Sequence, residues 1–220
     1  GNVNFPSFIG VLDGAVHDVI FDKPYINCTC SQADRVAVVA GWAGRSAGDI
    51  TAEITNVEVR DADVNVQGAY ASPTGILAGQ ANNATFTGCK VSGSVTAAGT
   101  SAECNIGGVI GEIDDKCSVS NITSDVEVTV ENTSRVIGGC IGSVRQACTI
   151  EDVHHKGILR IGGSGADYSG HLIGHIAGKV VVRNCSTEGS FSGSGKNSGG
   201  LIGSFFSGGS GSLVGTGGTV

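Results

Sequence analysis

The sequence predicts an all-β fold, a parallel β-helix, from two observations: one glycine-rich phrase recurs along the whole chain, and the runs between its copies are short and rich in β-branched residues. The clearest copy is Gly200-Leu201-Ile202-Gly203. The closing glycine of each copy, here called the anchor glycine, falls at Gly10, Gly41, Gly79, Gly111, Gly142, Gly174 and Gly203. Successive anchors lie 29 to 38 residues apart. A period near 31 residues is typical of solenoids, so we expect one domain over residues 1–220, with about seven turns.

Two further phrases follow each anchor. The first reads apolar, polar, Asx, apolar, as in Val119-Ser120-Asn121-Ile122, and the second alternates strictly, as in Val126-Glu127-Val128-Thr129-Val130. Each repeat therefore predicts three short strands, and nothing of helical period intervenes. Each strand should pair with its copy one turn on, about 4.8 Å away. The general preference of parallel connections predicts a right-handed coil.

Stacking gives the repeated positions a physical meaning, because like residues should lie above like. Three apolar columns are predicted to point inward and to bury against themselves. They are Val16, Ile54, Phe86, Val119, Ile150 and Val182; Val19, Val57, Cys89, Ile122, Val153 and Cys185; and Leu12, Ala43, Ala81, Ile113, Val144, Ile176 and Phe205. The Asx column (Asp18, Asn56, Asn121, Asp152 and Asn184) is interpreted as turn residues, since Asn and Asp tolerate left-handed backbone; a row of metal or sugar ligands is the alternative.

Composition excludes several classes. The net charge is −7, so the chain lacks the basic surface that is typical of a nucleic-acid-binding protein. No apolar run approaches the length of a membrane span. The 37 glycines show no Gly-X-Y period, which excludes collagen. The absence of methionine indicates processing or a piece of a larger chain, and residues 207–220 are read as a partial turn or a linker.

Cysteines and histidines offer little chemistry. Cys117 and Cys148 each lie six residues after an anchor, so they should stack on adjacent turns at a distance compatible with a disulfide; buried thiols are the favoured alternative. His171 and His175 would lie about 13 Å apart on one strand, too far to share a metal. We therefore predict no metal site and no cofactor.

Four carboxylates are the candidate binding residues. Asp61 and Asp63 alternate on one predicted strand, as do Asp125 and Glu127, so each pair shares a face and adjacent turns could bring the faces together. Paired carboxylates facing one groove are also what a glycosidase uses, while outward acidic residues equally solvate any β-rod. One Trp and three Tyr are few for sugar stacking. No catalytic residue is assigned.

The repeated phrase resembles the GLUG-motif repeat proteins. The best matches are Gly108-Val109-Ile110-Gly111, Gly139-Cys140-Ile141-Gly142 and Gly200-Leu201-Ile202-Gly203; the copies at Gly10, Gly41 and Gly79 lack the leading glycine or the aliphatic pair. The resemblance implies a secreted or cell-surface bacterial protein, with an address outside the cell or in the outer envelope. It implies a non-catalytic, adhesin-like display or binding module whose partner is a host or bacterial surface glycan or protein. The alternatives are a carbohydrate-active β-helix enzyme (a polysaccharide lyase or hydrolase) and a passive stalk.

Overall fold

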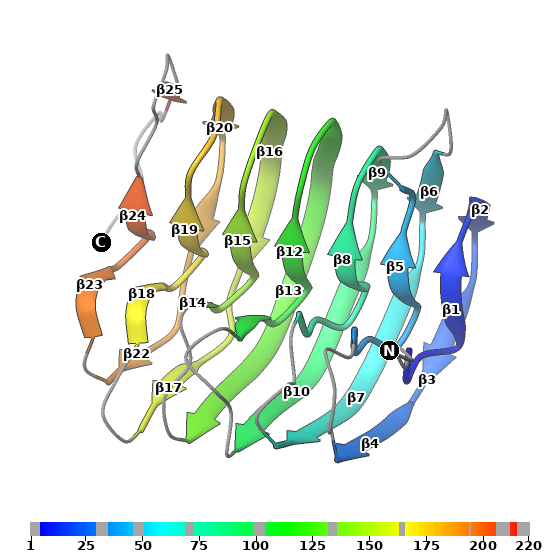
Figure 1. Cartoon of the computed structure of the whole chain (residues 1–220), viewed down its shortest axis with the longest axis horizontal. Helices are drawn as coiled ribbons and strands as arrows, with labels where there is room; N and C mark the ends of the chain where they lie inside the picture. The colour runs from blue at the N-terminus through cyan, green and yellow to red at the C-terminus, as the bar shows by residue number, and fades with distance from the viewer. Residues whose placement is uncertain are drawn as a thin grey trace.

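The chain forms a coil of parallel strands in the computed structural model, which describes residues 5–29, 35–45, 51–68, 73–98, 104–131, 136–162, 166–193, 195–205 and 212–214. Every strand pair there is parallel, and the described residues contain no helix. Consequently no helix in this part of the chain is long and apolar enough to cross a membrane. The predicted β-helix is confirmed (Figure 1).

Sheet A contains the anchor glycines. Its strands, in spatial order, are β1 (Ile9–Leu12), β5 (Ala40–Ala43), β8 (Ala78–Ala81), β12 (Ile110–Ile113), β15 (Ile141–Val144), β19 (Ile173–Ile176) and β24 (Ile202–Phe205). The stacking order equals the chain order, so each turn contributes one strand to this sheet.

Sheet B is the long wall behind sheet A (Figure 1). Its strands are β2 (Gly14–His17), β3 (Ile20–Asp22), β4 (Tyr25–Thr29), β6 (Ala52–Thr55), β7 (Glu58–Gln67), β9 (Ala84–Thr87), β10 (Lys90–Ala98), β13 (Cys117–Glu131), β16 (Cys148–His155), β17 (Leu159–Ile161), β20 (Val180–Arg183), β21 (Ser186–Thr187), β22 (Phe191–Ser192) and β25 (Ser212–Val214). Strand β25 pairs with β20, and the rest of residues 207–220 lies outside the described residues.

The division of each turn into strands differs from the prediction. The second and third phrases both belong to sheet B, and in β13 they form one strand of 15 residues. The third wall, sheet C, comes instead from residues immediately before the glycine pair: β11 (Asn105–Gly107), β14 (Val136–Gly138), β18 (Ala166–Gly170) and β23 (Gly195–Gly199). Isolated bridges at Val36 and Thr74 continue this sheet toward the N-terminus.

The described residues form about five complete turns, fewer than the seven predicted, because the turns of the first and last anchor glycines are incomplete in them. In Figure 1 the strands of sheet A run upward in front, those of sheet B run downward behind, and the chain advances from right to left. This sense of winding is right-handed, as predicted.

The predicted inward columns are confirmed by the register. Ile54 pairs with Phe86, Phe86 with Val119, and Val119 with Ile150. The column from Leu12 to Phe205 runs without a shift through all seven strands of sheet A. In the central turns these side chains are fully buried. A self-stacked column of aliphatic side chains therefore forms the core, as the solenoid prediction requires.

The anchor glycines allow sheets A and C to touch. We call the junction of these two sheets the crease. A Cβ at Gly111 would lie 2.5 Å from the Thr74 backbone nitrogen, and one at Gly174 would lie 2.6 Å from the Ile137 carbonyl oxygen. Any side chain at these positions would collide with backbone that cannot move aside. The recurring glycine phrase is thus explained by close backbone approach rather than by a turn.

The Asx column forms the bend within sheet B. All five members have left-handed backbone, with φ between 51° and 55°, and the equivalent position of the third repeat is Gly88 with φ of 68°. Asn56 Nδ2 also donates to Asp18 Oδ1 on the preceding turn at 3.2 Å. The interpretation of this column as turn residues is confirmed.

Candidate functional site

The four predicted carboxylates lie on the outer face of sheet B. Asp63 and Glu127 are both register partners of Ser94, so they occupy one column two turns apart. Asp125 is the register partner of Ser92, and Asp61 lies on the other side of the same serine. The structure thus brings the four side chains together around Ser92 and Ser94; we call this arrangement the acidic rectangle.

A β-bulge fixes the first corner of the acidic rectangle. The register between β7 and β10 shifts between Val91 and Gly93, and Asp61 takes left-handed backbone with φ of 49°. The Asp61 amide then donates to Ser92 Oγ at 3.0 Å. Bulges commonly redirect a side chain at a surface site, and this one fixes the backbone of the exposed Asp61 against Ser92.

Two other corners have partners within sheet B. Asn65 Nδ2 donates to Asp63 Oδ1 at 2.8 Å, and the Arg160 guanidinium forms an ion pair with Glu127. Asp125 is exposed. The rectangle therefore presents carboxylate oxygens and serine hydroxyls on the outer face of sheet B.

The spacing of the rectangle decides what it can do. Carboxylates in one column are separated by two strand spacings, about 9.6 Å, with a serine between them. That is close to the widest separation used by inverting glycosidases and well beyond that of retaining enzymes. Among the described residues no three His, Cys, Asp or Glu side chains are grouped so that they could hold a metal ion. The arrangement suits contact with a broad partner.

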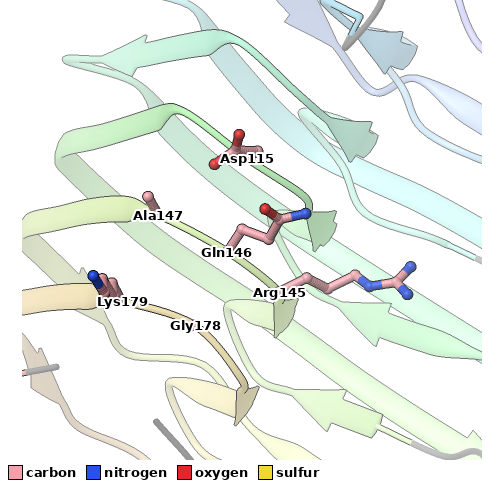
Figure 2. Close-up of a pocket in the computed structure, with 6 residues that line it drawn as sticks. All are labelled: Asp115, Arg145, Gln146, Ala147, Gly178 and Lys179. Carbon is pink, nitrogen blue, oxygen red and sulfur yellow. The ribbon is translucent and has the colours of Figure 1, made fainter. Parts of the chain in front are cut away.

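A shallow pocket lies elsewhere, where sheet A turns over into sheet B. Its volume is about 250 Å³, and its lining residues are Asp115, Arg145, Gln146, Ala147, Gly178 and Lys179. Figure 2 shows the guanidinium of Arg145 extending away from the Asp115 carboxylate. The pocket is an open depression between three neighbouring turns, and it contains none of the four predicted carboxylates.

Sequence reasoning missed a polar network at the crease. The nearly buried Glu112 accepts from Gln80 Nε2 at 3.0 Å, from Arg145 Nη1 at 3.3 Å, and from Asn105. Arg35 donates to Gln80 and stacks over the Trp42 ring at 4.2 Å. The network gives the buried Glu112 carboxylate and Gln80 amide their partners, although the buried Trp42 Nε1 has none among the described residues, and its role is structural. The sequence does contain a pattern that predicts this network. Trp42, Gln80 and Glu112 each directly follow an anchor glycine, so the three side chains should stack on successive turns.

A second missed contact joins two histidines in the interior. The rings of His155 and His171 meet edge to face at 5.1 Å. His155 Nδ1 contacts Ser124 Oγ at 3.1 Å, and His171 Nε2 contacts the Gly157 carbonyl at 3.0 Å. Burial, together with the neighbouring His171, lowers the pKa of His155 to about 3. His155 is therefore a neutral residue of the core.

The stacked cysteines follow the prediction. Cys117 and Cys148 are register partners on adjacent turns, and both are free thiols. Burial raises the pKa of Cys117 to about 12 and also raises that of Cys148. A thiol of so high a pKa is a poor nucleophile and a poor metal ligand, so neither residue adds a reactive site.

Comparison with known proteins adds no relative. No family model, no curated protein and no solved structure matches the chain. Function must therefore be argued from the surface itself.

Proposed function

We propose that this chain is a non-catalytic binding or display module of a secreted or cell-surface bacterial protein, and that it contacts its partner through the outer face of sheet B. The observation that carries the proposal is the acidic rectangle. Four carboxylates and two serine hydroxyls are presented at strand-to-strand spacing on a wall that the backbone ladder keeps rigid. Residues on a rigid scaffold bind with little loss of conformational entropy.

The outer face around the rectangle is mainly polar, and the exposed Tyr25 adjoins Asp63 on the N-terminal side. The strand β10 presents Lys90, Ser92, Ser94 and Thr96, and the neighbouring strand β13 presents Thr123, Asp125, Glu127 and Thr129. Hydroxyl and carboxylate groups hydrogen-bond readily to a glycan or to a polar protein surface. A partner that spans several turns would meet the same chemistry at each step of the coil.

The address outside a bacterial cell, and the choice between a surface glycan and a surface protein as partner, rest on the resemblance of the repeats to GLUG motifs. The alternative activity, a polysaccharide lyase or hydrolase, needs two carboxylates facing one groove. The four carboxylates instead stand on the outer face of sheet B with a serine between the members of each column, and none of them lines the pocket described above. We therefore expect no release of reducing ends from polysaccharides incubated with the protein.

Binding should be tested by screening the labelled protein against glycan arrays and bacterial surface extracts. The informative variant neutralises the rectangle with Asp61→Asn, Asp63→Asn, Asp125→Asn and Glu127→Gln; asparagine retains the left-handed backbone at residue 61. The matched control removes four charges elsewhere, with Asp13→Asn, Asp18→Asn, Asp115→Asn and Glu188→Gln.

We expect binding by the wild type and by the control, and at least tenfold weaker binding by the rectangle variant. Equal binding by both variants would exclude the rectangle as the contact surface. No binding in any screen would favour a passive stalk, and polysaccharide cleavage would favour the enzyme.

A further inference from the structure

Among the described residues, the apolar interior of the coil reaches solvent at its two terminal turns. The position two places before each anchor glycine faces inward, and its central members Val39, Leu77, Val109, Cys140 and Leu172 are at most 1 % exposed. The same position in the N-terminal turn is Phe8, which is 64 % exposed, and in the last turn it is the partly buried Leu201. The apolar column that seals the middle of the rod therefore reaches solvent at its ends.

Exposed apolar side chains concentrate on the terminal turns. The large exposed hydrophobic residues among the described ones are Phe8, Ile20, Tyr25 and Phe205. Phe8 packs edge-on against Phe21 with ring centroids 5.1 Å apart, and Phe21 is the register partner of the buried Val59, so Phe8 covers the interior of the N-terminal turn. Ile20 and Tyr25 lie on the outer face of sheet B, as register partners of Glu58 and Asp63. An exposed aromatic ring over the end of an apolar core marks a contact surface.

The strand edges at the two ends are complementary. In the described residues β1, β2, β3 and β4 each pair on one side only, and so do β23 and β24 at the opposite end (Figure 1). Because all strands are parallel and in register, the free edge at one end presents the groups that the free edge at the other end requires.

Charge disfavours contact between two N-terminal ends. Residues 5–29 carry Asp13, Asp18, Asp22 and Lys23, a net charge of −2. In the last turn Arg183, Lys196 and Glu188 form ion pairs with residues of the preceding turn, and Lys179 adds a positive charge. Two N-terminal ends would therefore repel each other, whereas a C-terminal end offers no such repulsion.

We propose that the partner of the open N-terminal end is a second copy of this chain, stacked head to tail so that its C-terminal turn continues the three sheets. This contact would cover Phe8 of one copy with the last turn of the next. The interface is heterologous and does not close by symmetry, so it allows chains of more than two copies.

The association should be followed by light scattering after size exclusion and by sedimentation, from about 1 µM to about 1 mM. The wild type should rise in mean mass from 22.0 kDa to beyond the dimer as the concentration increases. Phe8→Asp should block the N-terminal end, and Phe205→Asp should block the C-terminal end. Each variant alone should remain monomeric, because each head-to-tail contact uses both ends.

Mixing the two variants separates head-to-tail stacking from the other arrangements. An equimolar mixture of Phe8→Asp and Phe205→Asp should form a dimer that neither forms alone, since each supplies the end that the other lacks. A dimer of Phe205→Asp alone would overturn the proposal in favour of an N-terminal to N-terminal contact. A wild type that stays at 22.0 kDa over the whole range would overturn it altogether.

Two controls guard against loss of fold. Thr123→Asp adds the same charge to an exposed position of a central turn and should leave association unchanged. Each variant should keep the β-sheet circular dichroism spectrum of the wild type; if Phe8→Asp does not, Phe8→Ser replaces it with the same expected block. Association that persists in a folded Phe8 variant would also overturn the proposal.

Discussion

The crease and the outer face of sheet B are built in opposite ways. At the crease, glycines bring the backbones of sheets A and C into contact: a Cβ at Gly142 would lie 2.9 Å from the Ile106 carbonyl oxygen of sheet C and 2.3 Å from the Gly111 carbonyl oxygen of the preceding turn. On sheet B, side chains stand free above a regular ladder, and Ser, Thr, Asp, Glu, Lys and Asn replace one another from turn to turn. The comparison shows that the close backbone contacts at the crease restrict which residues can occur there. The outer face of sheet B has no such restriction, so its side chains can vary to form a binding surface.

The largest expected effect is at the crease itself. Gly142→Ala places a methyl group against the Gly111 carbonyl oxygen and the Ile106 backbone. Because neither group can retreat without breaking the ladder, we expect a loss of about 4 kcal/mol or more in the free energy of unfolding, measured by urea denaturation. The control is Gly162→Ala, whose nearest neighbour would be the Val130 carbonyl oxygen at 3.6 Å; it should stay within about 0.5 kcal/mol. Equal effects would refute the role given to the anchor glycines.

The next effect compares the two faces of sheet B. Ile150 is fully buried in the first inward column, while its neighbour Thr149 points outward. Ile150→Ala should lower the free energy of unfolding by about 2–5 kcal/mol, and Thr149→Ala by less than about 0.5 kcal/mol. Chemical denaturation of both variants measures the contrast. A cost at Thr149 similar to that at Ile150 would mean that the outer wall is not free to vary.

The stability of the fold should depend on pH through His155. This residue lies on sheet B, and its ring packs against Gly139 beside the crease. Its pKa is about 3 in the fold and about 6.5 in the unfolded chain, so between these values the unfolded chain binds one more proton. Stability from this residue is complete above pH 6.5 and falls as the pH is lowered, by up to about 1.4 kcal/mol per pH unit. Thermal unfolding between pH 6.5 and pH 4.5 should show this slope.

His155→Leu is the control for the pH effect. It removes the titrating group and should flatten the dependence of the melting temperature on pH over the same interval. An unchanged dependence would assign the acid sensitivity to other groups.

The smallest effect concerns the bend inside sheet B. Asn121 has φ of 55°, a conformation that alanine adopts at a cost of about 1–2 kcal/mol. Asn121→Ala should lower the unfolding free energy by about that amount. Asn121→Gly should lower it by less, because glycine enters left-handed backbone freely. If both substitutions cost the same, the side-chain contacts of Asn121 rather than its backbone would fix the bend.

Much of this fold could be predicted from the sequence because a solenoid converts spacing into position. Once Gly111 and Gly142 are aligned, the pairing of Val119 with Ile150 follows from counting, and Phe86 joins them because its phrase aligns with theirs one residue closer to its anchor. Counting also places Cys117 beside Cys148, while their free thiols are shown by the structure. Aligned positions must stack wherever every turn has equivalent strands.

The third wall and the contacts that depend on it could not be predicted. The spacing of the repeats shows which residues stack, but not where the chain turns from one sheet to the next. The strands of sheet C are short and lack the alternation that marks β13, and the contact of His155 with His171 depends on that third wall. The acidic rectangle could be predicted only in part. Asp61 and Asp63 share a face, as expected from strand alternation, but no feature of the sequence indicates the bulge that brings the Asp61 amide to Ser92.

The in-register ladders have one further consequence, for length. Since every strand of sheet A pairs only with its counterparts in the preceding and following turns, a whole turn could be gained or lost without changing any other pairing rule. Each such unit would extend the rod by about 4.8 Å. The number of repeats then sets the length of the rod. The length of the outer face of sheet B can change in steps of one turn, while its side chains can change one residue at a time.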